Sequence, residues 1–267
     1  MRNVTKLVAV AMCMWAIGCA PAHMPSLWDV PPETSADAKK YISHLASWDP
    51  QSRAQACLAV RSLEGKDAEA AAPYVVALLT DETMAWRPSR WVRYSGNAVS
   101  LEAWRTVKAL RKHMIPALVD ALTSRSVALR REAASALGDI GGSAAEEALP
   151  TVLDDPDAEV RLRAAVALGP IPGSVAEEAL RTVLDDRDAE IRARAAIALA
   201  RMGDSSMFDR LLACLDSDNW RLRRDAIKAL AAIGDPRAID AISPITQDET
   251  PAVKEAAEKA LESLRAE

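Results

Sequence analysis

The sequence is poor in the residue types from which many catalytic and metal sites are built. Its 267 residues include only three histidines and four cysteines. His23, His44 and His113 do not stand at metal-ligand spacing from one another, from a cysteine or from a carboxylate. We therefore predict that the chain is not an enzyme, with no catalytic residues, no bound metal and no cofactor.

A surplus of positive charge is also lacking. The formal net charge is −5, and aromatic residues make up only 4% of the chain. Nucleic-acid binding depends on basic side chains that face the phosphates, so this balance argues against a nucleic-acid partner. The one long apolar stretch lies at the N-terminus, and no candidate transmembrane helix follows it.

What the sequence does contain is a repeat of 31 residues. A medium-sized apolar residue returns at Leu129, Val160, Ile191, Leu222 and Val253. Two further columns contain only alanine, at positions 133/164/195/226/257 and 136/167/198/229/260. A third contains only leucine, at positions 137/168/199/230/261. A constant period of this length indicates stacked modules, each of which contacts only its neighbours.

Each module is predicted to be a helical hairpin. The second, longer helix follows a column of N-capping side chains at positions 126, 157, 188, 219 and 250. Beyond the cap, Val160, Ala164 and Leu168 form one apolar stripe at helical spacing. In the first helix, Ser143–Glu146 and Ser174–Glu177 have the spacing of capping boxes. The sequence thus predicts an all-α fold, a right-handed α-solenoid of about seven helical hairpins.

The repeat also resembles a known family. The run Asp-x-Asp-Ala-Glu-Val-Arg-x-x-Ala-Ala-x-Ala-Leu-Gly at 155–169, which returns in similar form at 186–200, resembles the HEAT-like repeats of the phycobilin-lyase type. The resemblance covers about residues 114–267 and extends weakly to about residue 35. It implies a structural ladder in which a turn Asp and a helix Arg join successive repeats.

The ladder positions follow from the same resemblance. They are Asp155, Asp186 and Asp248, with Arg130, Arg161, Arg192, Arg223 and Lys254. Ser124 and Ser217 interrupt the acidic column, so we expect the ladder to be incomplete there.

Some proteins with similar repeats are enzymes, namely bilin lyases and the iron-dependent deoxyhypusine hydroxylases, which use paired His-Glu motifs. This sequence has no His-Glu pair, which excludes the hydroxylase interpretation. A lyase-type enzyme or cofactor chaperone remains an alternative that rests on the fold alone. A structural cell-envelope component is a third.

The N-terminal half carries a degenerate form of the repeat. Ala56 and Ala103 occupy the same repeat position but lie 47 apart, and the surplus falls in an insertion at 81–96. We therefore divide the chain into four segments. These are a signal peptide at 1–18, a proline-rich spacer at 19–34, degenerate repeats at 35–112 and regular repeats with a C-terminal cap at 113–267.

The insertion at 81–96 is the candidate partner-binding site. It contains three aromatic and three arginine residues, which are Trp86, Trp91, Tyr94, Arg87, Arg90 and Arg93. Both kinds of side chain are enriched at binding hot spots. The alternative is that the tryptophans pack back onto the solenoid while the arginines extend into solvent.

The N-terminus suggests how the chain is localised. Arg2 and Lys6 precede a short apolar stretch that ends in Ala16-Ile17-Gly18-Cys19. This pattern is typical of a secretory signal, and its end resembles the lipobox of bacterial lipoproteins, with Cys19 as the lipidated residue. An ordinary signal cut near Ala22 and an uncleaved anchor are the alternatives. The lipoprotein interpretation implies export across the inner membrane and anchoring by the lipid. If the source has two membranes, Ala20 favours the outer membrane, with the protein facing the periplasm.

Taken together, these features predict a lipid-anchored scaffold, without catalytic activity, that binds a protein or peptide. Two structural expectations accompany it. Glu258 stands where the preceding repeats have alanine or isoleucine, so we expect it to be exposed on a terminal cap. Cys57 and Cys214 lie in distant repeats, so we expect them to be buried and not bridged.

Overall fold

The computed structural model describes residues 24–47, 49–81 and 98–266, and every regular element in these ranges is helical. Fourteen α-helices, α2 to α15, are joined by short turns and 3-10 segments and pack in hairpins. The predicted all-α hairpin fold is confirmed. The chain divides into two compact units, and the boundary falls between Ile140 and Gly141. Gly141 and Gly142 both have positive φ, of 68° and 84°, a conformation that favours glycine.

The N-terminal unit contains six α-helices within its described residues. They are α2 (Ala36–Leu45), α3 (Pro50–Val60), α4 (Gly65–Ala77), α5 (Ala98–Leu110), α6 (Ile115–Leu122) and α7 (Val127–Ile140). Helix α3 packs on α5 and α5 on α7, while α2 packs on α4 and α4 on α6. The unit therefore has two helix layers, one built from the first helices of the hairpins and one from the second.

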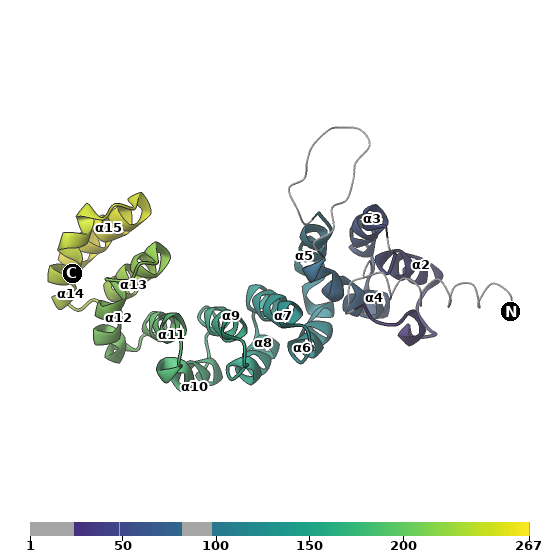
Figure 1. Cartoon of the computed structure of the whole chain (residues 1–267), viewed down its shortest axis with the longest axis horizontal. Coiled ribbons are helices and arrows are strands. Elements are labelled where there is room, and N and C mark those ends of the chain that lie inside the picture. The colour runs from purple at the N-terminus through teal and green to yellow at the C-terminus, as the bar shows by residue number, and fades with distance from the viewer. Residues whose placement is uncertain (1–23, 48, 82–97, 267) are drawn as a thin grey trace. The chain divides into compact units, whose positions relative to one another are not determined.

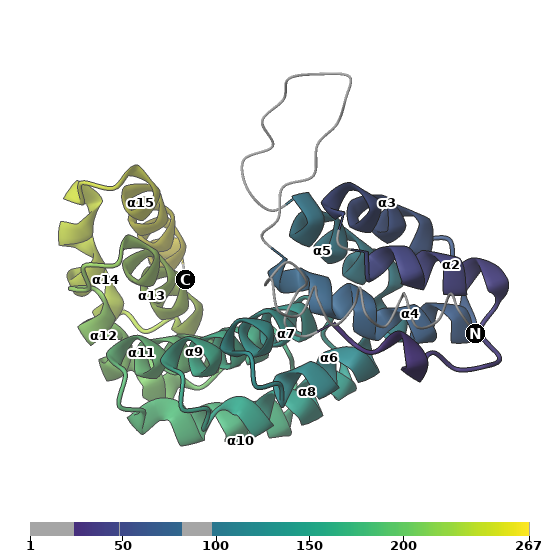
Figure 2. The same cartoon turned by 45° about the vertical axis from the view of Figure 1, so that its right-hand side comes forward.

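The C-terminal unit repeats the same arrangement. Its helices are α8 (Ser143–Ala148), α9 (Ala158–Leu168), α10 (Ser174–Thr182), α11 (Ala189–Arg201), α12 (Phe208–Cys214), α13 (Trp220–Ile233), α14 (Arg237–Ile242) and α15 (Pro251–Ala266). The longer second helices α9, α11, α13 and α15 form one row, and the shorter first helices form the other (Figure 1). Within this unit the row of longer helices lies on the inner side of the curve, as a second view shows (Figure 2).

The repeat columns of the sequence form the core. Ala133, Ala164, Ala195, Ala226 and Ala257 are all completely buried. The leucine column is buried as well, and so are Leu149, Leu180, Leu211 and Ile242 on the first helices. Alanine lets the second helices approach closely, while the leucines fill the space between the two layers. The predicted register of the repeat is confirmed.

The helix starts agree with the sequence for four of the second helices, but not for α8 and α10 among the first helices. Ser126, Asp157, Asp188 and Asn219 each accept a backbone N–H of the following helix through the side chain. The predicted capping boxes are wrong, because α8 and α10 start one residue earlier than expected. Gly142 and Gly173 are their N-caps, and neither helix has a side-chain cap.

The described part of the proline-rich segment belongs to the folded unit. Leu27–Asp29 form a 3-10 turn, and Tyr74 on α4 donates a hydrogen bond of 2.6 Å to the Ser26 carbonyl. The backbone N–H of Ser35 donates to the Asp67 carboxylate at 2.9 Å. Residues 24–34 are therefore docked on α4, unlike the extended spacer that their prolines suggest.

The C-terminal helix α15 differs from the preceding second helices at one repeat position, as expected. Glu258 is exposed, whereas Ala134, Ala165, Ala196 and Ile227 at the same repeat position are buried. Helix α15 therefore presents a polar face, as a terminal repeat requires. Across residues 24–47, 49–81 and 98–266, no helix is both long and apolar enough to cross a membrane.

Candidate functional site

The turn before each second helix is built around one side chain of the acidic column. In the regular turns Asp155, Asp186 and Asp248 accept the backbone N–H of the residue two positions on, at 2.7–2.9 Å. Ser124 and Ser217 make the same contact through their hydroxyls, at 3.2 Å. This hydrogen bond fixes the turn, and either side chain can provide it.

An arginine on each second helix is held by this turn. Its Nη1 donates to the carbonyl six residues back, from Arg161 to Asp155 at 2.9 Å and from Arg192 to Asp186 at 2.7 Å. Arg130 and Arg223 make the equivalent contact with Ser124 and Ser217, at 2.9 and 2.7 Å. The guanidinium therefore has the same orientation from repeat to repeat.

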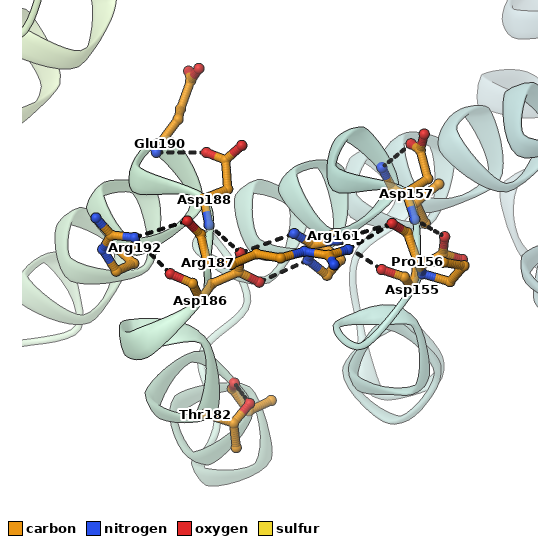
Figure 3. Close-up of polar contacts among 12 residues, drawn as sticks. Asp155, Pro156, Asp157, Arg161, Thr182, Asp186, Arg187, Asp188, Glu190 and Arg192 are labelled. Atoms are coloured by element: carbon orange, nitrogen blue, oxygen red, sulfur yellow. Dashed lines mark hydrogen bonds and ion pairs between the residues drawn. The ribbon is translucent and has the colours of Figure 1, made fainter.

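Two rungs of the predicted ladder join successive repeats in the C-terminal unit. Arg161 donates from Nε and Nη2 to the two carboxylate oxygens of Asp186, at 2.8 and 3.0 Å (Figure 3). Arg223 makes the same bidentate contact with Asp248, at 2.8 and 3.0 Å. These hydrogen bonds lower the pKa of both carboxyl groups below 3.8. The two rungs hold each repeat in register with the next.

The rung between them is incomplete, as the serine in the acidic column implies. Ser217 occupies the position that corresponds to Asp186 and Asp248 in the complete rungs. Arg192 donates to the carbonyls of Asp186 and Arg187. Among the described residues, Nε and Nη2 of Arg192 have no hydrogen-bond partner. A groove of about 570 Å³ opens beside it, lined by residues of α11, α12 and the turn at Ser217.

The N-terminal unit contains a buried rung that the sequence pattern did not reveal. Arg53 Nε donates to Asp81 Oδ2 at 2.6 Å, and its Nη1 donates to the Ser47 carbonyl at 2.6 Å. The two side chains are 0% and 2% exposed. Asp81 lies 28 residues after its arginine, whereas the regular rungs span 25. The fixed offset of the regular repeats therefore misses this pair.

A second cluster lies on the inner row of the C-terminal unit. Asp225 accepts hydrogen bonds from Arg194 at 3.0 Å and from Arg224 at 2.8 Å, and Arg201 lies 3.6 Å away. Arg221 and Arg224 both stack near the Trp220 ring, with their Cζ atoms 4.7 and 5.3 Å from its centroid. We call these six residues, on α11 and α13, the Trp220 surface.

The sequence contains a signal for the Trp220 surface that the 31-residue period alone does not reveal. Position 220 belongs to a column otherwise occupied by Val127, Ala158, Ala189 and Pro251. A tryptophan among these small residues departs from the pattern just where the helix begins. Such departures from a repeat column mark residues that the packing of the repeat does not require.

The other candidate residues have different outcomes. Cys19 and the aromatic and arginine residues at 86–94 lie outside the described residues. Cys57 and Cys214 are free and buried, and burial raises the pKa of the Cys57 thiol to about 12. No cluster of three or more His, Cys, Asp or Glu side chains suited to a metal ion occurs in the part of the chain that the model describes.

Comparison with known proteins identifies the family. The family model for HEAT repeats matches residues 115–186 and 177–262, which together cover more than half of the chain. The chain belongs to the HEAT-repeat family. No curated protein is significantly similar to it in sequence.

Three solved structures are among those similar to this chain. An archaeal HEAT-like repeats protein from Thermococcus onnurineus NA1 is 13% identical, with a TM-score of 0.52 over 88% of this chain and 99% of that chain. The Cnd3–Cnd2 condensin subcomplex of S. pombe is 16% identical, with a TM-score of 0.54 over 84% of this chain and 32% of that chain. The CpcE–CpcF complex of phycocyanin lyase from Nostoc sp. PCC7120 is 22% identical, with a TM-score of 0.48 over 90% of this chain and 100% of that chain. HEAT-repeat solenoids are generally protein-binding scaffolds.

Proposed function

We propose that this HEAT-repeat protein is a scaffold without catalytic activity, held at a membrane by a lipid on Cys19, that binds a protein or peptide. The Trp220 surface is the observation that carries the proposal for binding. It combines a half-buried aromatic ring, near which two arginines stack, with further arginines on the inner row of a solenoid unit. Tryptophan and arginine are the side chains most enriched among residues that dominate binding energies.

The charge of this surface indicates the kind of partner. Arg194, Arg201 and Arg224 are arranged around the Asp225 carboxylate, Arg221 stacks near the Trp220 ring, and Glu190 pairs with Arg194. Arginines therefore outnumber carboxylates at this surface, within an acidic chain. An acidic segment with an apolar side chain for Trp220 would complement it. The condensin subunit named above, whose structure is that of a complex with a second subunit, is one example of this fold bound to a protein.

Photo-crosslinking in cells tests the binding proposal. A photoreactive residue at position 221 on the inner row should capture a discrete partner, and the same residue at position 240 on α14, in the row of first helices, serves as the matched control. Both native side chains are exposed. Equal labelling from the two positions, or none from position 221, would count against a partner at this surface.

The insertion is a second candidate surface and is tested separately. Deletion of residues 82–95 removes Trp86, Trp91 and Tyr94 with the neighbouring arginines. If this insertion provides the specific contact, the deletion abolishes capture of the partner while the protein remains folded. Recovery of the same partners after deletion would assign no binding role to the insertion.

Membrane anchoring depends on Cys19, and a labelling experiment tests it. Cells that express the full chain should incorporate labelled palmitate into the protein and retain it in the membrane fraction. The Cys19→Ser variant should lose both properties, because serine lacks the thiol that accepts the diacylglycerol. Equal labelling of the two proteins would refute the lipoprotein assignment.

A further inference from the structure

Arg192 is an arginine whose position is fixed but whose ion pair is missing. Its Nη1 is held by the carbonyls of Asp186 and Arg187, as Arg223 is held by those of Ser217 and Asp218. In Arg161 and Arg223, Nε and Nη2 then bind both oxygens of an aspartate from the next repeat. In Arg192, these two donors have no partner among the described residues.

The neighbouring interruption of the ladder behaves differently. At the earlier serine of the acidic column, Ser124, the arginine position of the preceding helix is occupied by Ser100, which donates to the Leu79 carbonyl at 2.7 Å. There both members of the rung are replaced, so no guanidinium is left unsatisfied. At Ser217 only the acid is replaced, and the arginine keeps the orientation that a carboxylate requires.

The space beside Arg192 can admit a ligand. The groove of about 570 Å³ is lined by Arg192, Ser217 and Asn219 together with apolar groups of Ala193, Ala196 and Leu222. A carboxylate that binds Nε and Nη2 would thus have apolar surface beside it for its own methylene group. Bidentate pairing with a preorganised guanidinium is among the stronger polar contacts in proteins.

Neighbouring acidic side chains do not prevent such a contact. Glu190, Asp216 and Asp218 also line the groove, but Glu190 is already engaged by Arg194 and Asn219. The complete rungs form in similar surroundings. Asp155 and Asp188 act on Arg161, and Asp218 and Glu249 act on Arg223, yet both arginines pair with their aspartates.

We infer that Arg192 is a carboxylate-binding site, and that its ligand is an aspartate or glutamate side chain of the bound partner. The ligand takes the place that Asp186 and Asp248 occupy in the complete rungs. This inference rests on the proposed scaffold function, because it assigns part of the partner's chemistry. It places a specific acidic contact in the C-terminal unit.

Side-chain NMR of the full-length protein tests this inference directly. The Nε–H resonance of Arg192, assigned by its loss in Arg192→Lys, is followed during titration with the blocked peptide acetyl-Gly-Asp-Gly-amide. We expect a saturable shift with this peptide, and none with the matched Asn peptide. The carboxylate could come from a side chain or from the C-terminus of a partner. A peptide whose only carboxylate is its C-terminus distinguishes these two sources. An equal or larger shift with that peptide would overturn the assignment to a side chain.

Two variants at position 217 provide the controls. Ser217→Asp supplies the missing acid from within the chain, so its Arg192 resonance should already be shifted and its apparent affinity for the Asp peptide should fall by about tenfold or more. Ser217→Asn, of similar size but neutral, should still respond. An Arg192 resonance that the Asp peptide does not move, or equal responses in Ser217→Asp and the native protein, would overturn the site.

The test is independent of the natural partner. A negative titration removes the carboxylate site and leaves the photo-crosslinking result at position 221 unaffected. Conversely, failure to crosslink any partner removes the scaffold proposal without changing what the titration reports. The two proposals can therefore fail separately.

Discussion

Replacement of Asp81 by alanine should destabilise the N-terminal unit strongly. Arg53 and Asp81 are 0% and 2% exposed and are joined by a hydrogen bond of 2.6 Å. Removal of the carboxylate leaves a guanidinium buried without its counter-charge, and breaking a buried pair in this way costs about 3–5 kcal/mol. Because 1.4 kcal/mol corresponds to a tenfold change in an equilibrium constant, the equilibrium constant for opening of this unit should rise by roughly a hundredfold to several thousandfold.

Hydrogen exchange measured by mass spectrometry is the suitable assay, because it reports on each unit of the full-length protein separately. Peptides from α3 and α4 should lose protection in Asp81→Ala, while peptides from α11 and α13 keep theirs. A matched control is Glu255→Ala, which removes an ion pair to Lys259 whose side chains are 72% and 65% exposed. This variant should exchange like the native protein.

A double variant separates the buried charge from other effects of the substitution. Arg53→Leu combined with Asp81→Ala removes both charges, so it should recover a large part of the lost protection. Unchanged exchange in Asp81→Ala would show that the pair is solvated and that the reasoning from burial is wrong. A double variant less stable than Asp81→Ala would show that the stranded guanidinium is not the source of the loss.

Three further predictions follow from the core, the ladder and the buried thiol. Ala195→Leu should lower stability by about 1–3 kcal/mol in thermal denaturation, because Ala195 is 0% exposed at a helix crossing, and an unchanged melting temperature would contradict the register. Since arginine lowers the folded-state pKa of Asp186 and Asp248, their stabilisation is complete well above 3.8 and is lost as the pH falls through the lowered values. Asp186→Asn combined with Asp248→Asn should flatten the pH dependence of unfolding there, and a profile identical to that of the native protein would disprove the coupling. Cys57 should resist iodoacetamide in the native protein and react after unfolding in urea, as peptide mapping can show, because burial raises its pKa to about 12. Rapid native alkylation would place the thiol in solvent.

The regular repeats could be predicted from the sequence because their packing is periodic. Each second helix meets the next at the same alanine, so the 133/164/195/226/257 column had to be small and buried, as it is. The turn caps at Asp157, Asp188 and Asn219 were predictable for the same reason, since a cap acts on backbone groups two or three residues away. Local chemistry repeated at a constant offset needs no knowledge of the rest of the fold.

The predictions that failed involved contacts set by the surroundings. Ser143 and Ser174 have the spacing of capping boxes, but the glycine turns before them start each helix one residue earlier. The prolines of residues 24–34 suggest an extended chain, but the Tyr74 hydroxyl and the Asp67 carboxylate hold this segment against α4. In the first case the adjacent glycine displaced the expected cap, and in the second a neighbouring helix outweighed the local preference of the prolines.

The sequence by itself determined the hairpin architecture, the buried columns and the place where the ladder is interrupted, because each depends on spacing along the chain. Tertiary structure decided which side chains meet across that spacing. It joined Arg53 to Asp81 over an irregular offset and gathered arginines around Asp225 and Trp220. It also left Arg192 oriented beside a groove, with two donors that no described residue accepts. Guanidinium pairing requires a distance near 3 Å and a shared plane, and only the packed helices fix these.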